Sequence, residues 1–150
     1  MPEVAPTRIG VVSASATAEA LDALVVPGRA IACRVAADEL LLLCAPDVSE
    51  EVARETGTRL TVLDPDALVV DSTDGWSSIE LEGDGARMAF SRLSSLELPD
   101  AGFVQGEVVH VPAKVVVDRD RVRILVSSMW ERHLHDRVAA LLRHTARQER

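Results

Sequence analysis

The stretch 37–55, ADELLLLCAPDVSEEVARE, has a counterpart in the stretch 119–137, RDRVRILVSSMWERHLHDR. In both, an acidic turn leads into an apolar strand, a short connection of small residues follows, and a helical pattern comes next. Upstream of each stretch, over 8–36 and 77–117, the pattern predicts strand, helix and strand. The sequence therefore predicts an α+β fold of two tandem β-α-β-β-α units, with antiparallel sheets packed against helices.

The expected organisation is a single domain over 1–150, with pseudo-repeat halves at about 8–63 and 67–147. A chain of 150 residues is long enough to bury a core of its own. In the first half, Thr17 or Ser15 is expected to begin a helix, and Asp47 to cap a second helix that Gly57 ends. Strands are expected at 60–64 and 67–71. In the second half, strands are expected over about 107–117 and 121–127, before a long helix from Met129 to Arg147.

Composition excludes several classes of function. The net charge of −8 argues against a nucleic-acid partner, because affinity for a phosphate backbone comes from clustered Lys and Arg. The longest apolar run, LLLLCA, has the length of a strand, far below the roughly 20 residues of a membrane span. The N-terminal residues lack the pattern of a secretory signal. The expected location is therefore the cytoplasm, with no membrane partner.

Cys33 and Cys44 are expected to be free thiols, as is usual in a reducing compartment. A hairpin that turns at Ala37-Asp38 would place Cys33 opposite Leu42, and Cys44 opposite Ile31. Both thiols would then lie diagonally on one face, with their backbones about 7–8 Å apart, which is a poor distance for a disulfide. The prediction is two buried, inert thiols.

The turn Gly83-Asp84-Gly85 precedes a predicted helix over 84–94 and could in principle cradle a phosphate. A dinucleotide fingerprint would need glycine at Met88, and a P-loop would need Lys and Ser or Thr after Gly85. Asp84 is expected to be the helix N-cap, where its charge would repel a phosphate. The glycines are therefore predicted to serve only the change of chain direction.

Neither a catalytic nor a metal site is expected. His133 and His135 are two residues apart, so they project from different faces of the predicted helix, and His144 lacks a partner ligand. No Gly-x-Ser-x-Gly elbow is present, and with four aromatic residues the chain lacks a platform for a flat cofactor. Trp130 is assigned to the apolar face of the last helix, with Leu134, Val138, Leu141 and Leu142, and is therefore expected in the core.

Three stretches together resemble the gamma subunit of heterotetrameric sarcosine oxidase: AADELLLLCAPDVSEEVARE, VVDSTDGWSSIELEGDGARMAFSRLSSLEL and GFVQGEVVHVPAKVVVDRDRVRILVSSMWERHLHDRVAALL. The similarity covers about 30–142 and consists of spaced features. These are the acidic turn before the leucine strand, Asp71 followed by Asp74-Gly75-Trp76, the Gly-x-x-Ala helix start, and Trp130 at the last helix. The family is related in fold to the folate-binding aminomethyltransferase (glycine cleavage T-protein) domain.

The resemblance implies a non-catalytic accessory subunit of an oxidase that demethylates an N-methyl amine such as sarcosine. Its partners would be larger alpha and beta subunits, which would carry FAD, FMN, NAD and tetrahydrofolate, so that no cofactor is expected on this chain. Aminomethyltransferases hold folate with acidic residues where this sequence has Pro112-Ala113, and an asparagine-containing stretch is replaced by Ser127-Ser128-Met129. The stretch TGTRLTVLDPD is also longer than expected for the family.

Trp76 and Phe103 are the candidate residues of a partner interface, because aromatic side chains are favoured there. Core packing is the alternative for each. Two other functions stay open at this point. One is a stand-alone folate-dependent one-carbon domain, and the other is an interaction domain of the same fold in an unrelated complex.

Overall fold

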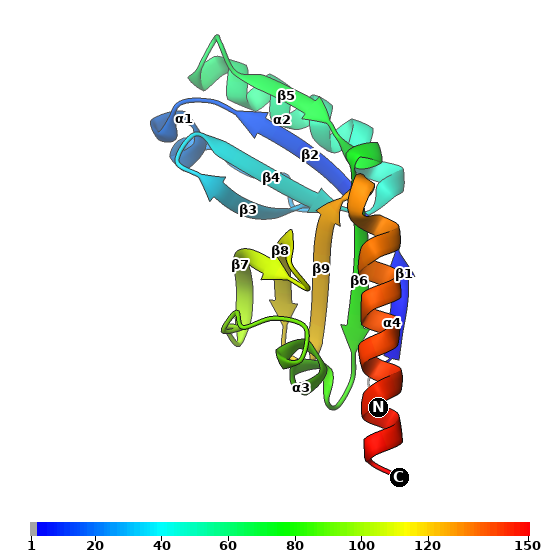
Figure 1. Cartoon of the computed structure of the whole chain (residues 1–150). Helices are drawn as coiled ribbons and strands as arrows, with labels where there is room; N and C mark the ends of the chain where they lie inside the picture. Colours follow the sequence, from blue (N-terminus) through cyan, green and yellow to red (C-terminus); the bar gives the residue numbers. More distant parts are fainter. Residues whose placement is uncertain (1–2) are drawn as a thin grey trace. The chain divides into compact units, whose positions relative to one another are not determined.

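The computed structural model describes residues 3–150, which fold as two compact units (Figure 1). The first unit is Arg8–Asp74. The second unit combines the N-terminal segment up to Thr7 with Gly75–Arg150. No helix among the described residues is both long and apolar enough to cross a membrane.

The first unit is a four-stranded antiparallel sheet of order β3-β4-β2-β5. Its elements in chain order are β2 (Gly10–Ser15), α1 (Ala18–Ala23), β3 (Ile31–Ala36), β4 (Glu39–Cys44), the 3₁₀ turn η1 (Pro46–Val48), α2 (Ser49–Leu63) and β5 (Leu68–Asp71). Every second residue of the strands faces α1 and α2. On this face of the sheet, Val12 and Leu42 pack with Val52 and Leu60 of α2. As predicted, Thr17 begins α1, and its hydroxyl accepts a hydrogen bond from the Ala20 amide at 3.2 Å.

The second unit is a five-stranded antiparallel sheet of order β1-β6-β9-β8-β7. Its elements are β1 (Glu3–Thr7), β6 (Trp76–Glu82), α3 (Ala86–Ser91), β7 (Ala101–Val108), β8 (Val111–Asp118), β9 (Arg121–Ser127), the 3₁₀ turn η3 (Ser128–Trp130) and α4 (Glu131–Gln148), and η2 (Thr73–Gly75) precedes β6. Helices α3 and α4 cover one face of this sheet, where Phe90, Leu134 and Val138 are buried against Ile79 and Ile124.

The two sheets repeat one plan, and the α+β fold class is confirmed. In the first unit, β2-α1-β3-β4-α2-β5 gives the order of a β-α-β-β-α-β motif. In the second unit, β6, α3, β8, β9 and α4 follow the same order, and β7 is an additional edge strand. The place that β5 holds beside β2 is filled beside β6 by the N-terminal strand β1. The strand expected at 67–71 is β5, which closes the first unit, whereas β1, which closes the second unit, was not predicted.

Helix α2 departs from the prediction at both ends. Gly57 lies inside the helix instead of ending it, and the expected strand at 60–64 is the last turns of α2. Leu60 is fully buried, so its contacts with the sheet outweigh the cost of a glycine within the helix, about 1 kcal/mol. The Asp47 cap is also wrong, because Asp47 lies within η1, and no side chain caps α2.

The predicted pairing of β3 with β4 is confirmed at the turn and wrong beyond it. Ala36 pairs with Glu39 as predicted, but a bulge between Arg34 and Ala36 shifts the pairing by one residue. Cys33 therefore pairs with Leu41, and Ile31 with Leu43, so Cys33 and Cys44 belong to opposite faces of the sheet. Both thiols are free, as expected. Burial raises the pKa of Cys33 to about 11, whereas Cys44 is only partly buried.

The expected strand over 107–117 is in fact a hairpin of two strands. β7 and β8 meet at the two-residue turn Val109-His110, in which both residues have positive φ values, 44° and 66°. Such turns normally carry Asn-Gly. Because Val109-His110 lacks that signal, the turn could not be predicted from the sequence.

Candidate functional site

The two predicted interface aromatics lie on the same side of the second unit but do not form one patch. Trp76 begins β6 and pairs with Ser127, while Phe103 lies on β7 beside Val116 of β8. By strand alternation, both belong to the face opposite α3 and α4. Three strand spacings separate β6 from β7, about 14 Å. Both side chains are half-buried.

Charged residues dominate the face that these aromatics share. Glu80 on β6 is the centre of a small ion-pair network, with Arg121 at 3.1 Å and Arg123 at 3.0 Å. Arg121 also pairs with Glu82 at 2.9 Å. Carboxylates and guanidinium groups thus alternate across β6 and β9 on this face. Phe103 lies on β7, two strands away from β9, beside Val116 of β8.

Trp130 is not in the core, contrary to the prediction, and is 38% exposed. The reason is local: η3 precedes α4, so Trp130 ends the 3₁₀ turn and falls outside the apolar face on which Leu134 and Val138 are buried. Its ring meets that of His133 edge-on, with centroids 5.9 Å apart. The neighbouring Met129 is 77% exposed.

Trp76, Met129 and Trp130 therefore lie at one end of the second unit's sheet, where β6 begins and β9 ends. We call these three residues the Trp130 surface. The pairing of Trp76 with Ser127 leaves only three residues of η3 between the partner strand and α4. Met129 and Trp130 are exposed and Trp76 is half-buried, and large apolar and aromatic side chains at the surface are typical of the central part of protein interfaces. Sequence reasoning missed Met129 and Trp130 because their spacing fits the helix pattern that follows.

A second apolar surface lies on the first unit, along β5. Leu68 and Val70 are 62% and 46% exposed, and β5 is an edge strand within the described sheet. A groove of about 480 Å³ runs between β5 and α2, where Ala53, Gly57 and Thr61 leave space. Gly57, which was expected to end α2, lies inside the helix, and its lack of a side chain leaves room for this groove.

One cluster in the first unit brings together residue types that are used in catalysis. The Asp71 carboxylate accepts hydrogen bonds from the Thr73 hydroxyl at 2.6 Å and from the Ser49 hydroxyl at 2.8 Å. Cys44 lies next to Ser49 around Gly10, where a Cβ would come within 2.9 Å of Sγ. Burial and the charge of Asp71 raise the pKa of Cys44, so the reactive thiolate is disfavoured.

This cluster has a structural role, because its hydrogen bonds join secondary-structure elements. Asp71 joins the end of β5 to the first turn of α2 through Ser49, and to the 3₁₀ turn η2 through Thr73. The Thr73 hydroxyl in turn accepts a hydrogen bond from the Val11 amide of β2 at 3.0 Å. Among the described residues, no imidazole contacts Ser49 to act as its base. This gives a structural role to Asp71, which was named from the sequence only as one of the spaced features of the family resemblance.

Asp71→Asn is expected to lower the free energy of unfolding by about 1 kcal/mol at neutral pH. The Thr73 hydroxyl, and then Ser49, hold the pKa of Asp71 below its ordinary value of 3.8. Such a carboxylate stabilises the fold fully above its unfolded pKa, and that contribution disappears as pH falls through the folded value. Urea titrations at a series of pH values should therefore show a smaller loss in acid for Asp71→Asn than for wild type.

The matched control is Asp74→Asn, since Asp74 lies in the same segment and makes no side-chain hydrogen bond among the described residues. Its expected effect is within about 0.5 kcal/mol. An equal loss of unfolding free energy in both variants would show that the hydrogen bonds of Asp71 do not stabilise the fold.

The glycine turn of the second unit serves chain direction, as predicted, but Asp84 is not the cap. Gly83 and Gly85 have φ values of 101° and 87°, and Gly85 itself occupies the N-cap position of α3 without any side-chain cap. Arg87 donates hydrogen bonds to the carbonyls of Pro99, Asp100 and Arg119. The basic side chain nearest this turn therefore holds together backbone segments.

The histidines and the residues at the folate positions offer no clustered ligands. Within residues 3–150, no group of three or more His, Cys, Asp or Glu side chains could hold a metal ion. Pro112 lies on the β7–β8 hairpin opposite Glu107, and Ala113 is buried in the core. Neither side chain has a polar group to offer a ligand.

Comparison with solved structures extends the picture of the fold. No protein-family model matches the sequence, and neither does any curated protein. A chain of the heterotetrameric sarcosine oxidase from Corynebacterium sp. U-96, in complex with pyrrole 2-carboxylate, is similar with a TM-score of 0.75 at 15% identity. The match covers 95% of this chain and 84% of that chain.

Regulatory subunits of aspartate kinase are similar as well. The ligand-free form from Thermus thermophilus gives a TM-score of 0.55 at 12% identity, covering 93% of this chain and 97% of that one. The subunit from Thermus flavus gives 0.52 at 11% identity, covering 93% and 96%. At such identities the likeness is one of fold. The chain therefore shares its two-sheet α+β fold with a chain of a heterotetrameric oxidase and with regulatory subunits of a kinase.

Proposed function

We propose that this chain is a non-catalytic accessory subunit of a flavin- and folate-dependent amine oxidase of the heterotetrameric sarcosine oxidase type. The observation that carries the proposal is the fold likeness over 95% of the chain to a chain of such an oxidase. The spaced sequence features around Asp71, Trp76 and Trp130 point to the same family. On this proposal, FAD, FMN, NAD and tetrahydrofolate belong to the larger alpha and beta subunits, and the complex demethylates an N-methyl amine such as sarcosine.

The chemistry of the clusters supports an accessory role. The Ser49–Asp71 pair is used to join secondary-structure elements, the pKa of each cysteine is raised, and Arg87 binds backbone carbonyls. The Trp130 surface, with Trp76, Met129 and Trp130, is the proposed contact with a larger subunit. Phe103 is a second proposed contact, on the face opposite the helices.

A different complex is the second candidate. The similarity to regulatory subunits of aspartate kinase shows that the fold also occurs in chains that are named for regulation. An interaction domain in an unrelated assembly would use the same exposed surfaces but would not co-purify with flavin. A stand-alone folate domain would instead bind reduced folate without any partner.

The test is purification of the tagged chain from its native cells, with the visible absorption and the subunit masses of the eluate recorded together. We expect larger chains and a flavin spectrum to co-elute, and the eluate to oxidise sarcosine. The double variant Met129→Ser with Trp130→Ala should lose these chains. Met88→Ser is the matched control, because Met88 is also exposed, at 65%, but lies on α3, away from the Trp130 surface.

Two results would contradict the proposal. A chain that elutes colourless and alone would show that the likeness is of fold only. Tight binding of reduced folate, or turnover of an N-methyl amine by the isolated chain, would assign the chemistry to this subunit itself. Phe103→Ala tests the second proposed contact in the same way.

A further inference from the structure

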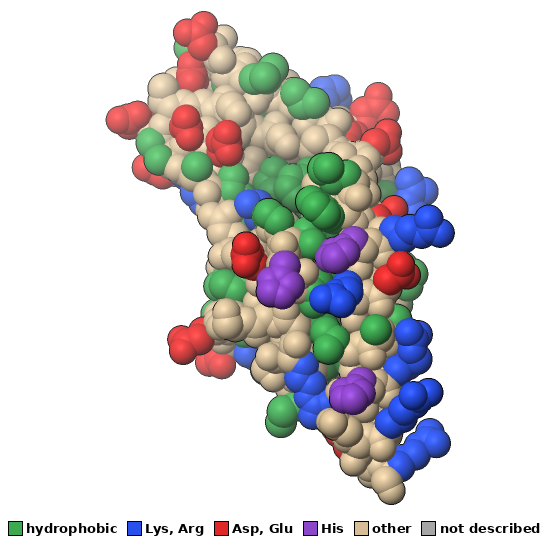
Figure 2. All heavy atoms as spheres, viewed as in Figure 1, with side chains coloured by type: hydrophobic (Ala, Val, Ile, Leu, Met, Phe, Trp, Pro, Cys, Tyr) green, Lys and Arg blue, Asp and Glu red, His purple; other side chains and the backbone are tan. Residues whose placement is uncertain are grey.

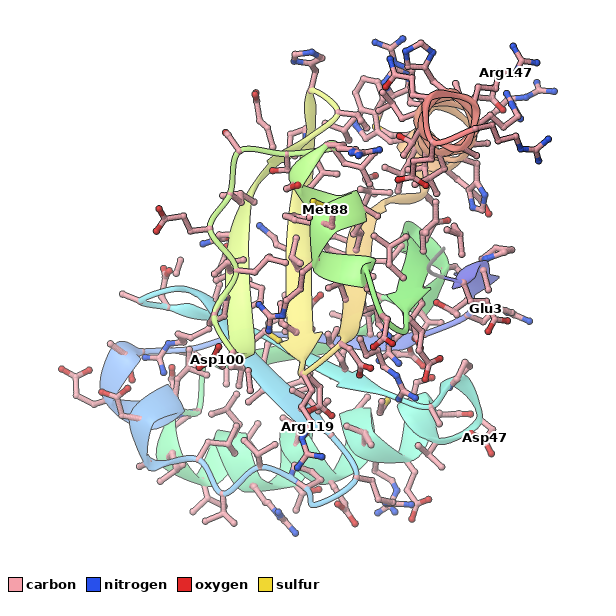
Figure 3. All side chains as sticks on the ribbon, turned by 90° about the horizontal axis from the view of Figure 1, so that it is seen from below. Glu3, Asp47, Met88, Asp100, Arg119 and Arg147 are labelled. Carbon is pink, nitrogen blue, oxygen red and sulfur yellow. The ribbon has the colours of Figure 1, made fainter. Side chains whose placement is uncertain are left out.

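The second unit contains a cavity of about 360 Å³ between the end of α3, the β7–β8 turn and α4. Figure 3 shows α3, with Met88 labelled, and α4, seen nearly end-on with Arg147 pointing away, on the same side of the β8–β9 strands. The cavity is lined by Arg92, Leu93, Val109, His110, Arg137, Ala140 and Leu141. Its lining thus combines an apolar floor with three side chains that can donate hydrogen bonds.

The two guanidinium groups of this cavity have no acidic partner. No lining residue is acidic, and among residues 3–150 neither Arg92 nor Arg137 makes an ion pair. Arg29, Arg34, Arg121 and Arg123 each pair with a carboxylate, whereas Arg143 of α4, like Arg92 and Arg137, makes no ion pair among residues 3–150. In a chain of net charge −8, two unpaired arginines beside one cavity leave a local positive potential that attracts an anion.

The turn that brings His110 to the cavity is strained. Val109 and His110 both have positive φ values, which are uncommon for residues other than glycine and unfavourable for a β-branched side chain. The buried Val109 side chain and a 2.8 Å hydrogen bond from its amide to the Leu93 carbonyl hold the turn in place. Strain of this kind concentrates at binding sites, where the surroundings over-determine the conformation.

We propose that this cavity binds a small organic carboxylate with an apolar body. Arg92 and Arg137 would donate charge-assisted hydrogen bonds to the carboxylate, and the His110 imidazole would donate a further one from the turn. The apolar body would lie against Leu93, Val109 and Leu141. Small-molecule sites combine apolar contacts with a few converging polar groups, and four of the seven residues that line this cavity are apolar. A bare inorganic anion would leave that apolar floor unused.

Benzoate is the probe, titrated into the full chain while the imidazole C–H resonances of its four histidines are followed by NMR. We expect the His110 resonances to shift and to saturate below about 10 mM, while those of His133, His135 and His144 stay in place. Benzamide, which lacks the charge, and inorganic phosphate, which lacks the apolar body, should each bind at least about tenfold more weakly.

Arginine variants distinguish binding at this cavity from a general effect of positive charge. Arg137→Gln should weaken benzoate binding by about tenfold or more, and so should Arg92→Gln. Arg143→Gln is the matched control, because Arg143 is an exposed arginine of α4 that does not line the cavity. Figure 2 shows that Lys and Arg side chains gather along α4, so this control removes one of several similar charges.

His110→Gly distinguishes a ligand role from a structural one. Glycine is favoured at the second position of this turn, so the variant should unfold at a higher urea concentration than wild type. Its affinity for benzoate, measured by calorimetry, should nevertheless fall. Higher stability with weaker binding is the result that a purely structural histidine would not produce.

Several outcomes would overturn the proposal. These are unmoved His110 resonances at saturating benzoate, equal weakening by Arg137→Gln and Arg143→Gln, or phosphate binding as tight as benzoate binding. Unchanged benzoate affinity in His110→Gly would remove His110 from the site. Because binding is measured on the free chain, these results are independent of whether the proposed oxidase partners exist.

Discussion

Phe90→Ala should lower the free energy of unfolding of the second unit by about 3–5 kcal/mol, a large part of the total stability of a domain. Phe90 is the largest fully buried side chain and lies on α3, among the core residues contributed by β6, β8 and α4. Helix α3 has only six residues, and its other buried members are Ala86 and Ala89. Removal of the ring would leave α3 with little apolar surface to hold it on the sheet.

Tryptophan fluorescence during urea unfolding reports on the unit that contains Phe90. Both tryptophans, Trp76 and Trp130, belong to the second unit, so their signal follows that unit, whereas circular dichroism follows both units. Met88→Ala is the matched control, since Met88 lies on the same helix but is exposed, and should change stability by less than about 0.5 kcal/mol. Similar effects of the two substitutions would refute the idea that Phe90 anchors α3.

Gly10→Ala should destabilise the first unit by about 1–3 kcal/mol. A Cβ at Gly10 would lie 2.9 Å from the Ala45 carbonyl oxygen, 2.9 Å from the Cys44 sulfur and 3.0 Å from the Ser49 Cβ. One of these atoms belongs to the backbone and another to the first turn of α2, so relief would require β2 to move away from β4. Gly10 is therefore needed for the close approach of β2 to the start of α2.

The effect is best read from circular dichroism, because the first unit contains no tryptophan. Gly28→Ala is the control, because a Cβ there would meet nothing within 4 Å. It should leave stability unchanged or raise it slightly by restricting the unfolded chain. A Gly10→Ala protein as stable as Gly28→Ala would show that the neighbouring segments yield without cost.

Much of the fold follows from the regular spacing of hydrophobic residues along the sequence. The alternation in 77–82 and the run LLLLC predicted strands that became β6 and β4, and the repeat of acidic turn, apolar strand and helix predicted the tandem plan. The segment 60–64 was one failure, because LTVLD suits a strand locally, yet it lies in α2, with Leu60 buried against the sheet. Local propensity is a weak signal, and burial decided the outcome.

The candidate surface was predictable only in part. Trp76 was identified because aromatic residues favour interfaces, but Met129 and Trp130 were hidden by a helical spacing that begins one turn too early. The cavity beside Arg92, His110 and Arg137 had no signal in the sequence at all. Its three donors are 18 and 27 residues apart along the chain, and lie just after α3, in the β7–β8 turn and on α4.

By itself, the sequence determined the class of the fold, the positions of most strands and helices, and the poor fit of its glycines and histidines to phosphate or metal chemistry. These properties depend on period, spacing and residue type, which are local. Only the tertiary structure decided the bulge that separates Cys33 from Cys44, the strand β1 that completes the second sheet, and the unpaired arginines around one cavity. Those features depend on which distant segments meet, and long-range packing leaves little trace in any single stretch of sequence.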